Sequence, residues 1–398
     1  MFETKYLVRA PLLDPRQNVL GYKLGWQKKE KNNAPPGEAD LRQLLAFVGE
    51  HAADRLGLLY VDTVPELLSA EALKTVPPAT TVLVLKQGDL LDAGHIALVT
   101  SLIDRGFGLA LQDADLARLT SNPALLSIVT QVEVAPDHPD LAAISRLSQI
   151  SESSFSVIVS RFPGWREFDA CAALGLNGFF PNLCLAVRES NPLGEPGPQT
   201  ALILKLMKMV QDNADVRELE KVLKHDATIS YKLFRYINSA GFGIEVEIES
   251  LRLAVAMLGY RPLFRWLSLL LAGTSSTGFS PALMQAAIVR GHFAELLGRG
   301  SLPKSEAENL FFVGMFSLLD RLLGIPMQEV LSRILLPEAV VQALLAREGA
   351  YGPFLALVEA CEQEDGCAAV HADALFMTAA DVNQAHVAAL AWAQNIKL

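Results

Sequence analysis

The sequence predicts a two-domain protein, in which an α/β domain built on a parallel sheet is followed by an all-helical domain. Short apolar runs alternate with helical segments up to about residue 190, and strand patterns nearly vanish after residue 198. Between them, Asn191–Pro198 contains five Pro or Gly residues in eight positions, which excludes a helix or strand core. We therefore expect domains at 1–190 and 199–398, joined by a linker at 191–198.

The first domain begins with strand-like segments at 6–9 and 19–24, on either side of a turn signal at 14–18. A helix is expected at 41–55, after a surface loop at 28–37. Beyond it, short runs that are apolar on both faces alternate with helices, as is typical of a parallel sheet covered by helices. This pattern fits a closed barrel and an open sheet equally well. Further strands are expected at 58–61, 81–85, 109–111, 128–129 and 156–159, with helices such as 94–105 and 165–174 between them.

The second domain shows helical spacing throughout. Thr378 and Asp381, three residues apart, form a helix-start signal before the last of its segments. Helices are expected at 202–211, 216–225, 228–238, 250–258, 261–271, 281–297, 305–323, 327–331, 338–347, 351–362 and 378–395.

Charge and hydropathy exclude several classes of partner. The chain has 34 Lys and Arg residues against 44 Asp and Glu residues, a formal net charge of −10, so we do not expect nucleic acid as a partner. The most apolar run, 262–273, contains Arg265 and is shorter than the ~20 residues of a membrane span. The first residues lack a signal-peptide pattern. Four cysteines without a CxxC pair are typical of reduced thiols, so we expect a cytoplasmic protein with no membrane partner.

Motifs that carry catalysis or bind metals are absent from the sequence. The seven histidines form no HxxxH or HExxH pair, and no histidine–cysteine set has the spacing of a zinc site. There is no GxGxxG, P-loop or GxSxG motif. The polar residues around His138 are interpreted as a surface loop, and Arg290–His292 as a core contact within a helix. We therefore predict no cofactor, no metal site and no catalytic residue.

Segments of both halves resemble known signalling domains. The opening residues 6–27 read as an arginine-containing strand, a proline turn and Gly-Tyr-Lys-Leu, and they resemble the start of an EAL domain. The segments 59–63, 105–113 and 174–177 keep the order of that family. The second half resembles the HDOD domain at 224–226, 230–233, 236–241 and 254–260. The whole chain thus resembles bacterial signal-transduction proteins in which a degenerate EAL domain precedes an HDOD domain.

This resemblance implies a TIM-type (β/α) barrel in the first domain. About 190 residues is short against the ~250 that are typical of such barrels. We therefore expect a truncated barrel with missing or reduced helices. We also expect an apolar outer face that the HDOD domain or a second subunit covers.

Active EAL domains are cyclic di-GMP phosphodiesterases that hold two divalent cations with carboxylates and an amide. By resemblance, Lys23 stands at the glutamate of the EAL motif, and Gln27 replaces an arginine that contacts phosphate. Asp62 replaces a metal-binding asparagine of the family. Asp113 is the one aspartate that remains of the family's aspartate pair, and Glu133 takes the place of the aspartate on a later strand. Two unit charges 4 Å apart interact by ~4 kcal/mol at an effective dielectric constant of ~20, so Lys23 would strongly repel a divalent ion.

The HDOD domain resembles the HD phosphohydrolase scaffold without its metal ligands. Ser317 and Leu318 stand where the His-Asp pair would be, so this domain is not expected to be catalytic. Asn238, Ser239 and Asp320 are polar residues on otherwise apolar helices. We expect them to cap helices and form buried hydrogen bonds, with contact to a partner protein as the alternative.

These replacements lead to the hypothesis of a non-catalytic scaffold or adaptor in cyclic di-GMP-related regulation. It would not be an enzyme and would act by contact with other signalling proteins or with itself as a homo-oligomer, and cyclic di-GMP is not expected as a partner. Two alternatives stay open. One is an effector that binds cyclic di-GMP without hydrolysis near Asp62, Asp113 and Glu133. The other is a residual metal-dependent phosphodiesterase that uses Asp113.

Overall fold

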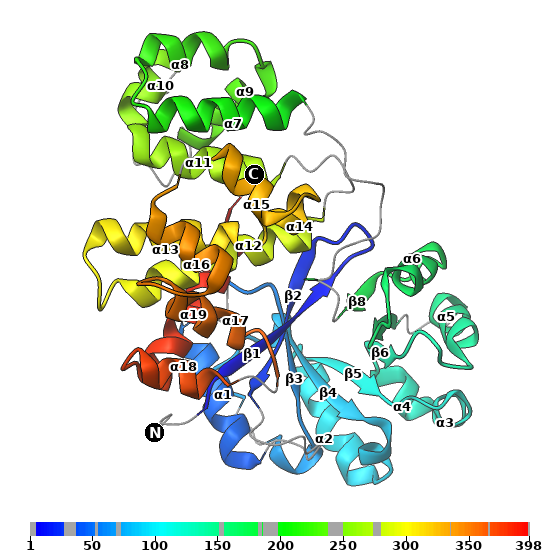
Figure 1. Cartoon of the computed structure of the whole chain (residues 1–398). Coiled ribbons are helices and arrows are strands. Elements are labelled where there is room, and N and C mark those ends of the chain that lie inside the picture. The colour runs from blue at the N-terminus through cyan, green and yellow to red at the C-terminus, as the bar shows by residue number, and fades with distance from the viewer. Residues whose placement is uncertain are drawn as a thin grey trace.

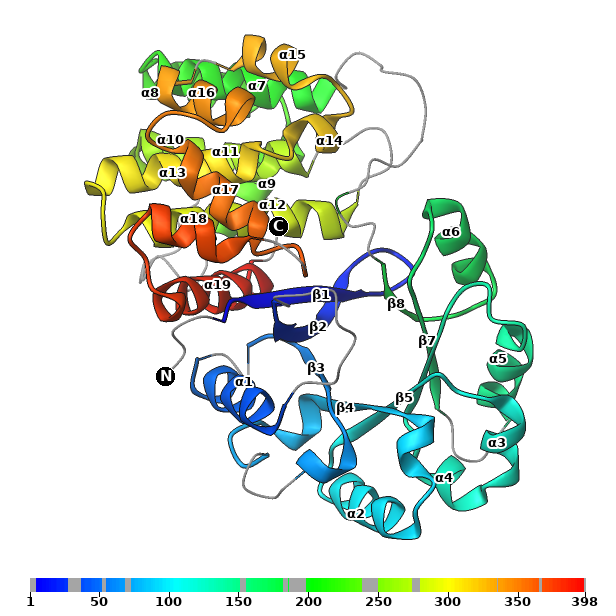
Figure 2. The same ribbon diagram turned by 60° about the horizontal axis from the view of Figure 1, so that its bottom comes forward.

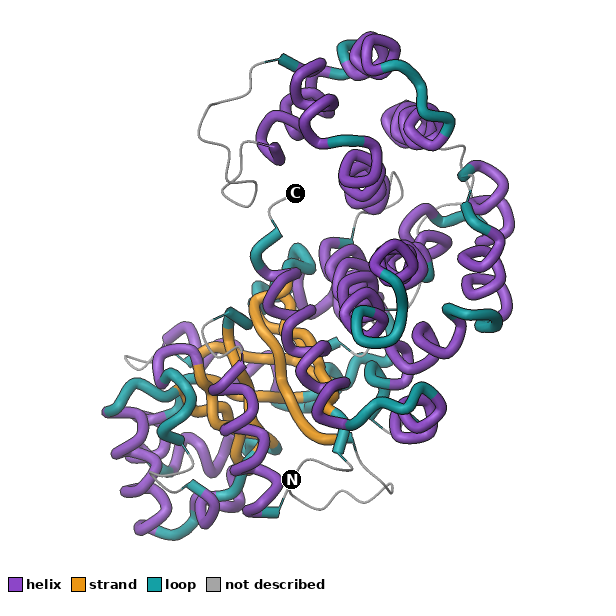
Figure 3. The backbone as a smooth tube through the Cα atoms, turned by 90° about the vertical axis from the view of Figure 1, so that its left-hand side faces the viewer, coloured by secondary structure: helices purple, strands orange, loops and turns teal. Residues whose placement is uncertain are grey.

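The computed structural model contains a β/α barrel and a helical domain that packs along one side of it (Figure 1; Figure 3). The structure describes residues 5–27, 37–51, 55–68, 73–150, 155–181, 185, 198–237, 250–273, 280–334, 336–364 and 367–396. Of the predicted linker at 191–198, only Pro198 lies within these residues, where it begins the first helix of the helical domain.

Eight strands close into a barrel in the order of the sequence. The strands β2 to β8 run parallel, while β1 is antiparallel to both of its neighbours, β2 and β8. The prediction of a TIM-type barrel is confirmed, and the open sheet is excluded. The strands are β1 (Leu7–Leu13), β2 (Val19–Trp26), β3 (Leu58–Asp62), β4 (Thr81–Lys86), β5 (Gly108–Gln112), β6 (Gln131–Val134), β7 (Ser156–Ser160) and β8 (Gly178–Phe180).

Helices cover the outside of the barrel between most pairs of strands. The helices are α1 (Glu38–His51), α2 (Ala93–Asp104), α3 (Leu116–Ser121), α4 (Pro123–Ile128), α5 (Leu141–Ile150) and α6 (Trp165–Ala173). Between β3 and β4, the described residues form only the short 3-10 turns η1 (Pro65–Leu67) and η2 (Pro78–Thr80), and a third turn, η3 (Gln87–Leu90), follows β4. The expected reduction of the helical layer is therefore found between β3 and β4.

The strand predicted at 128–129 is wrong. Ile128 is the last residue of α4, and the strand β6 begins three residues later. Asn122 accepts a hydrogen bond from the backbone N–H of Leu125, and Pro123 occupies the first helical turn. This cap and proline start a short helix that β-branched residues near its end do not reveal.

The barrel interior is a compact apolar layer beneath a polar end. Alternate residues along each strand point inward, and they include Leu12, Tyr60, Val84, Ile158 and Phe180. Their opposite neighbours, such as Leu59 and Val61, join the larger core under the surrounding helices. Apolar side chains thus fill the middle of the barrel interior. Polar groups therefore gather at the carboxyl-terminal ends of the strands.

The second domain is helical throughout its described residues, as predicted. Its helices are α7 (Pro198–Gln211), α8 (Val216–Leu223), α9 (Ala227–Ile237), α10 (Leu251–Leu258), α11 (Tyr260–Ala272), α12 (Pro281–Gly298), α13 (Lys304–Phe316), α14 (Leu319–Leu323), α15 (Met327–Arg333), α16 (Glu338–Ala346), α17 (Gly352–Ala360), α18 (Ala368–Ala374) and α19 (Ala379–Gln394). Among the helices that the structure describes, none has the length and apolar character needed to cross a bilayer.

The outer face of the β1–β2 hairpin packs against the helical domain. In Figure 2, β1 lies alongside α18 and α19. The backbone N–H of Leu7 donates to Oδ1 of Asn383 on α19 at 2.8 Å, and Gln285 on α12 donates to the hydroxyl of Tyr22 on β2 at 3.1 Å. The prediction that the helical domain covers an apolar face of the barrel agrees with this arrangement.

Two glycines let α12 and α13 cross at close range. A Cβ atom on Gly314 would lie 2.4 Å from the carbonyl oxygen of Arg290, and one on Gly291 would lie 2.8 Å from the carbonyl oxygen of Phe311. Both obstacles are backbone atoms, which cannot rotate away as a side chain can. The packing of the central helix pair therefore depends on the absence of side chains at these two positions.

We expect Gly314→Ala to lower the free energy of unfolding by about 1–3 kcal/mol, because the added methyl group forces the two helices apart. In an exposed helix the same change would stabilise by about 1 kcal/mol, so the sign of the effect is diagnostic. Urea denaturation monitored by circular dichroism would measure it. The control is Gly300→Ala, where a Cβ meets nothing within 4 Å. Equal stability of the two variants would contradict the prediction.

Candidate functional site

Polar side chains gather at the carboxyl-terminal ends of the barrel strands, which we call the barrel mouth. Lys23, Asp62, Gln112 and Glu133 occupy inward-pointing positions near the ends of β2, β3, β5 and β6. The strand register places Gln112 beside Glu133 and Lys23 beside Tyr60. In TIM-type barrels this end carries the active site, because the loops that follow the strands converge there. The structure thus brings together three of the residues predicted from the sequence.

The ammonium group of Lys23 lies between two carboxylates. Its Nζ atom is 3.0 Å from Oε2 of Glu133 and 3.4 Å from Oδ1 of Asp62. The same Oε2 accepts a second hydrogen bond from Nε2 of Gln112 at 2.9 Å. Nζ also stands 5.0 Å from the centroid of the Phe180 ring, which forms the apolar floor of the mouth.

This ion pair is charged at neutral pH although it is largely buried. Burial by itself would raise the pKa of Glu133, but the charge of Lys23 and the hydrogen bond from Gln112 lower it below its ordinary value. Burial opposes the charge of Lys23 as well, and Asp62 and Glu133 outweigh it, so its pKa is raised. Beneath them, burial raises the pKa of Tyr60 to about 12, which keeps its hydroxyl neutral.

A second, more exposed pair borders the barrel mouth. Asp113 follows β5 and Arg161 follows β7, and their Oδ1 and Nη2 atoms are 4.0 Å apart. Both residues have positive φ angles, 53° and 62°, which turn the chain sharply where each strand ends. Lys86, also exposed, ends β4. Sequence reasoning missed Arg161 because only its position directly after a barrel strand marks it.

The described residues do not fit the two-cation site of active EAL domains. No group of three or more His, Cys, Asp or Glu side chains that could hold a metal ion occurs among the residues that the structure describes. Lys23 occupies the space between the carboxylates of Asp62 and Glu133, where it neutralises one of their two charges. A divalent ion at this point would have to displace a buried ammonium group. We therefore derive no chemical step through a metal.

Gln27 lies at the rim of the barrel mouth and contacts the helical domain. Its Nε2 atom donates to the carbonyl oxygens of Ala360 at 3.0 Å and Gln363 at 2.9 Å. Its Oε1 atom accepts from the backbone N–H of Ala368 at 3.3 Å. Both ends of the amide are thus used in holding the connection between α17 and α18.

The polar residues predicted in the helical domain are partly described. Asn238 and Ser239 lie outside the described residues. Asp320 lies on α14, where its Oδ1 atom is buried without a hydrogen-bond partner within the described part of the chain. It is one of the negative groups that raise the pKa of Arg290. Ser317, at the position of the missing His-Asp pair, accepts a hydrogen bond from Nη1 of Arg290 at 2.8 Å.

Comparison with known proteins identifies both halves. Residues 198–326 match the family model of the HDOD domain. A Vibrio cholerae protein named Cyclic di-GMP phosphodiesterase CdgJ is 28% identical over 429 aligned residues, covering 99% of this chain and 93% of the relative. These matches support an EAL–HDOD two-domain protein, with the closed barrel first and the HDOD domain after it. The HDOD match ends well before residue 398, within the region predicted as one domain at 199–398.

Other relatives cover less of this EAL–HDOD protein. The uncharacterized protein YuxH of Bacillus subtilis is 25% identical over 196 residues, which is 48% of this chain and 47% of YuxH. The solved structure of Bacillus subtilis YkuI, a protein with an EAL domain in complex with its substrate c-di-GMP and calcium, is 14% identical with a TM-score of 0.35. It matches 64% of this chain and 72% of its own.

The relative CdgJ overturns three predictions from the sequence. The non-catalytic scaffold, the absence of enzymatic activity and the exclusion of cyclic di-GMP as a partner are wrong, because a relative that spans nearly the whole chain is named for hydrolysis of that dinucleotide. These predictions had rested on the replaced metal ligands and on the positive charge of Lys23 in place of a glutamate. The folded barrel mouth instead retains Asp62 and Glu133 and adds the cations Lys23 and Arg161.

We expect Lys23→Met to lower the free energy of unfolding by about 3–5 kcal/mol near pH 7.5, because it leaves the buried charge of Glu133 without the cation that neutralises it. Without Lys23, burial raises the pKa of Glu133 in the folded state above its unfolded value of about 4.3. The folded variant then binds more protons than the unfolded chain at intermediate pH, so its stability falls as pH rises and the loss is smaller near pH 4.5.

Urea denaturation of both proteins at pH 4.5 and pH 7.5 would measure this effect. Lys86→Met, at the exposed end of β4, is the matched control and should change the free energy of unfolding by less than about 0.5 kcal/mol. A loss for Lys23→Met that is the same at both pH values would show that Glu133 does not depend on Lys23 for its charge.

Proposed function

We propose that this chain binds cyclic di-GMP at the mouth of its barrel. The observation that carries the proposal is the placement of the basic residues Lys23 and Arg161 around the ends of parallel barrel strands, next to the carboxylates of Asp62 and Asp113. The similarity to CdgJ over 99% of the chain supports the same ligand. The barrel mouth groups these two cations with three carboxylates, and this mixed charge suits a ligand that carries both anionic phosphodiesters and N–H donors.

The chemistry of the ligand matches both kinds of charged group. Each of its two phosphodiesters carries one negative charge, which Arg161 can bind through parallel N–H donors and Lys23 as a point charge. The edge of each guanine presents N–H donors, and exposed carboxylates accept such hydrogen bonds. The side chains of Asp62 and Asp113 are 52% and 60% exposed, which leaves both available at the barrel mouth.

Hydrolysis of the bound dinucleotide is the second candidate function. The name of CdgJ supports it, since that relative aligns with both domains of this chain. Phosphodiester hydrolysis needs a group that activates water and positive charge that stabilises the transition state. Arg161 and Lys23 can supply positive charge, and the exposed carboxylate of Asp113 can accept a proton from water. The predicted cytoplasmic location, where cyclic di-GMP would be met, stays a prediction.

We expect Arg161→Gln to weaken binding of cyclic di-GMP about tenfold, which corresponds to the loss of one charge-assisted hydrogen bond worth about 1.4 kcal/mol. Isothermal titration calorimetry on the full chain, with and without Mn²⁺, would measure the dissociation constant. Chromatographic detection of the linear dinucleotide in the same samples would measure turnover.

Arg146→Gln is the matched control, since Arg146 lies on α5, outside the barrel, and its Nε atom contacts only the backbone of its own helix. Its dissociation constant should equal that of the unaltered chain. If the unaltered chain shows no saturable heat with cyclic di-GMP under either condition, and forms no linear product, then the proposed function is wrong.

A further inference from the structure

The β1–β2 hairpin belongs to the barrel but is held from outside by the helical domain. Arg9 on β1 points away from the barrel interior, and its Nη2 atom is 3.1 Å from Oε1 of Glu362. Only 8% of the Arg9 side chain and 6% of the Glu362 side chain are exposed. Nη1 of Arg9 also donates to Nε2 of His386 on α19. Because burial and Arg9 hold the pKa of His386 well below its usual value, this ring is neutral and accepts the bond.

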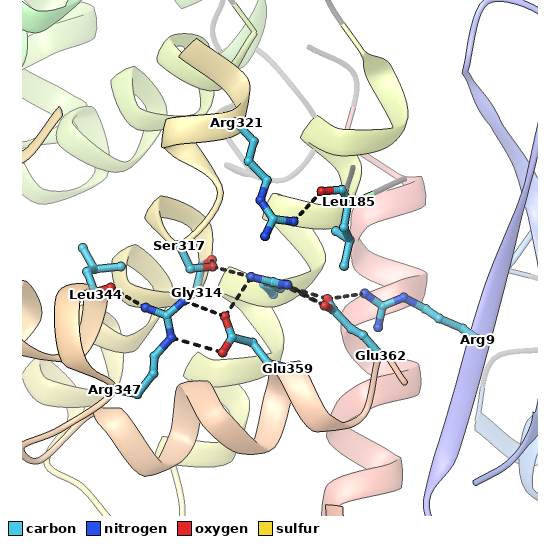
Figure 4. A network of polar contacts seen from close by, with 10 residues as sticks. Arg9, Leu185, Gly314, Ser317, Arg321, Leu344, Arg347, Glu359 and Glu362 are labelled. Carbon is cyan, nitrogen blue, oxygen red and sulfur yellow. Dashed lines mark hydrogen bonds and ion pairs between the residues drawn. The ribbon is translucent and has the colours of Figure 1, made fainter. Parts of the chain in front are cut away.

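The contact continues into the centre of the helical domain as a chain of alternating charges (Figure 4). Arg290 donates to both carboxylate oxygens of Glu362, with its Nη2 atom 2.7 Å from Oε2. Nη1 of Arg290 is 3.2 Å from Oε1 of Glu359. The same Oε1 atom is 2.9 Å from Nη2 of Arg347, which is the last residue of the series. The chain therefore runs from Arg9 through Glu362, Arg290 and Glu359 to Arg347.

The two ends of this chain differ in what they hold. Arg347 pairs with Glu359 and caps α16, entirely within the helical domain. Among the described residues that form this series of ion pairs, Arg9 is the only one that belongs to the barrel. If Arg9 is removed, Glu362 keeps its two-point contact with Arg290. Loss of Arg9 thus leaves two arginines and two glutamates, a balanced set. Replacement of Arg9 and replacement of Arg347 each remove one terminal arginine from the series of ion pairs, but only Arg9 belongs to the barrel.

The strand held in this way, β1, pairs with β2, which carries the central cation of the barrel mouth. In the β1–β2 pairing, Arg9 is opposite Leu24 and Ala10 is opposite Lys23. At the end of β2, Gln27 fixes the rim to the helical domain through three backbone groups. The helical domain therefore holds β1 opposite Lys23, and it contacts the end of β2 at Gln27, four residues beyond Lys23. A shift of this strand would move Nζ of Lys23 away from Asp62 and Glu133, which belong to other strands.

We propose that Arg9 and Gln27 are positioning residues through which the helical domain holds Lys23 in place at the barrel mouth. Arg9 and Gln27 act on a ligand only through Lys23, so their effect on the binding of cyclic di-GMP rests on the proposed function. Their effect on the position of Lys23 does not rest on the proposed function. The β1–β2 hairpin is the element that the two domains share. Because contacts from the helical domain and contacts within the barrel both fix its position, a change in one domain can be transmitted to the other.

The experiment measures the chemical reactivity of Lys23 in the full chain. Reductive methylation followed by mass spectrometry reports how readily each lysine is modified, with exposed Lys86 as the internal reference. In the unaltered chain, Lys23 should react slowly, since 17% of its side chain is exposed and it is paired with two carboxylates. We expect Arg9→Met and Gln27→Ala each to raise the rate at Lys23 about tenfold, as for the loss of one coupling contact of about 1.4 kcal/mol.

Arg347→Met is the matched control, because it removes the opposite end of the same ionic chain. It should lower thermal stability as Arg9→Met does while the rate at Lys23 stays unchanged. Gln27→Ala keeps the test decisive if Arg9→Met does not fold. Unchanged reactivity of Lys23 in folded Gln27→Ala, or an equal rise in Arg347→Met, would overturn the inference.

Calorimetry on the same variants separates this inference from the proposed function. If both hold, Arg9→Met and Gln27→Ala bind cyclic di-GMP about tenfold more weakly, and Arg347→Met binds as the unaltered chain does. If Lys23 becomes reactive in the two positioning variants but the unaltered chain binds no dinucleotide, the positioning role is supported and the proposed function fails.

Discussion

The arrangement of the whole molecule depends on one buried carboxylate, that of Glu362, held between two arginines from different domains. Burial would favour its neutral form, but Arg290 and Arg9 keep its pKa below the ordinary range. Arg290 satisfies this carboxylate from within the helical domain, and Arg9 adds the contact that comes from the barrel. Through that contact and the bond to His386, Glu362 joins β1 to the end of α17 and to α19.

The two domains share one electrostatic design. In the barrel, the ammonium of Lys23 lies between Asp62 and Glu133, and in the helical domain the guanidinium of Arg290 lies between Glu359 and Glu362. In each case, a buried basic side chain lies between two carboxylates. The partners of both cations are side chains of the protein itself, so folding of the chain is sufficient to form each cluster.

The sequence predicted the domain order and most elements because burial on both faces of strands such as β4 and helical spacing in the second half are local properties. The resemblance placed Lys23, Asp62 and Glu133 together at the barrel mouth. It did not predict the contacts of Gln27, whose partner Ala360 is 333 residues away and accepts through its backbone. Nor did it predict the ionic chain from Arg9, because such pairs depend on how the two finished domains meet. The order of the strands in a closed barrel was likewise outside what periodicity can decide.

The hydrogen bond between Leu7 and Asn383 spans 376 residues, so the first strand of the barrel meets this neighbour only after the intervening chain has been synthesised. At ~5–20 residues per second, the outer face of the hairpin stays uncovered for tens of seconds. During that interval Tyr22, Leu24 and the unpaired charge of Arg9 have no shelter from α12 or α19. The covering of the hairpin by the helical domain is therefore a late step in the synthesis and folding of this chain.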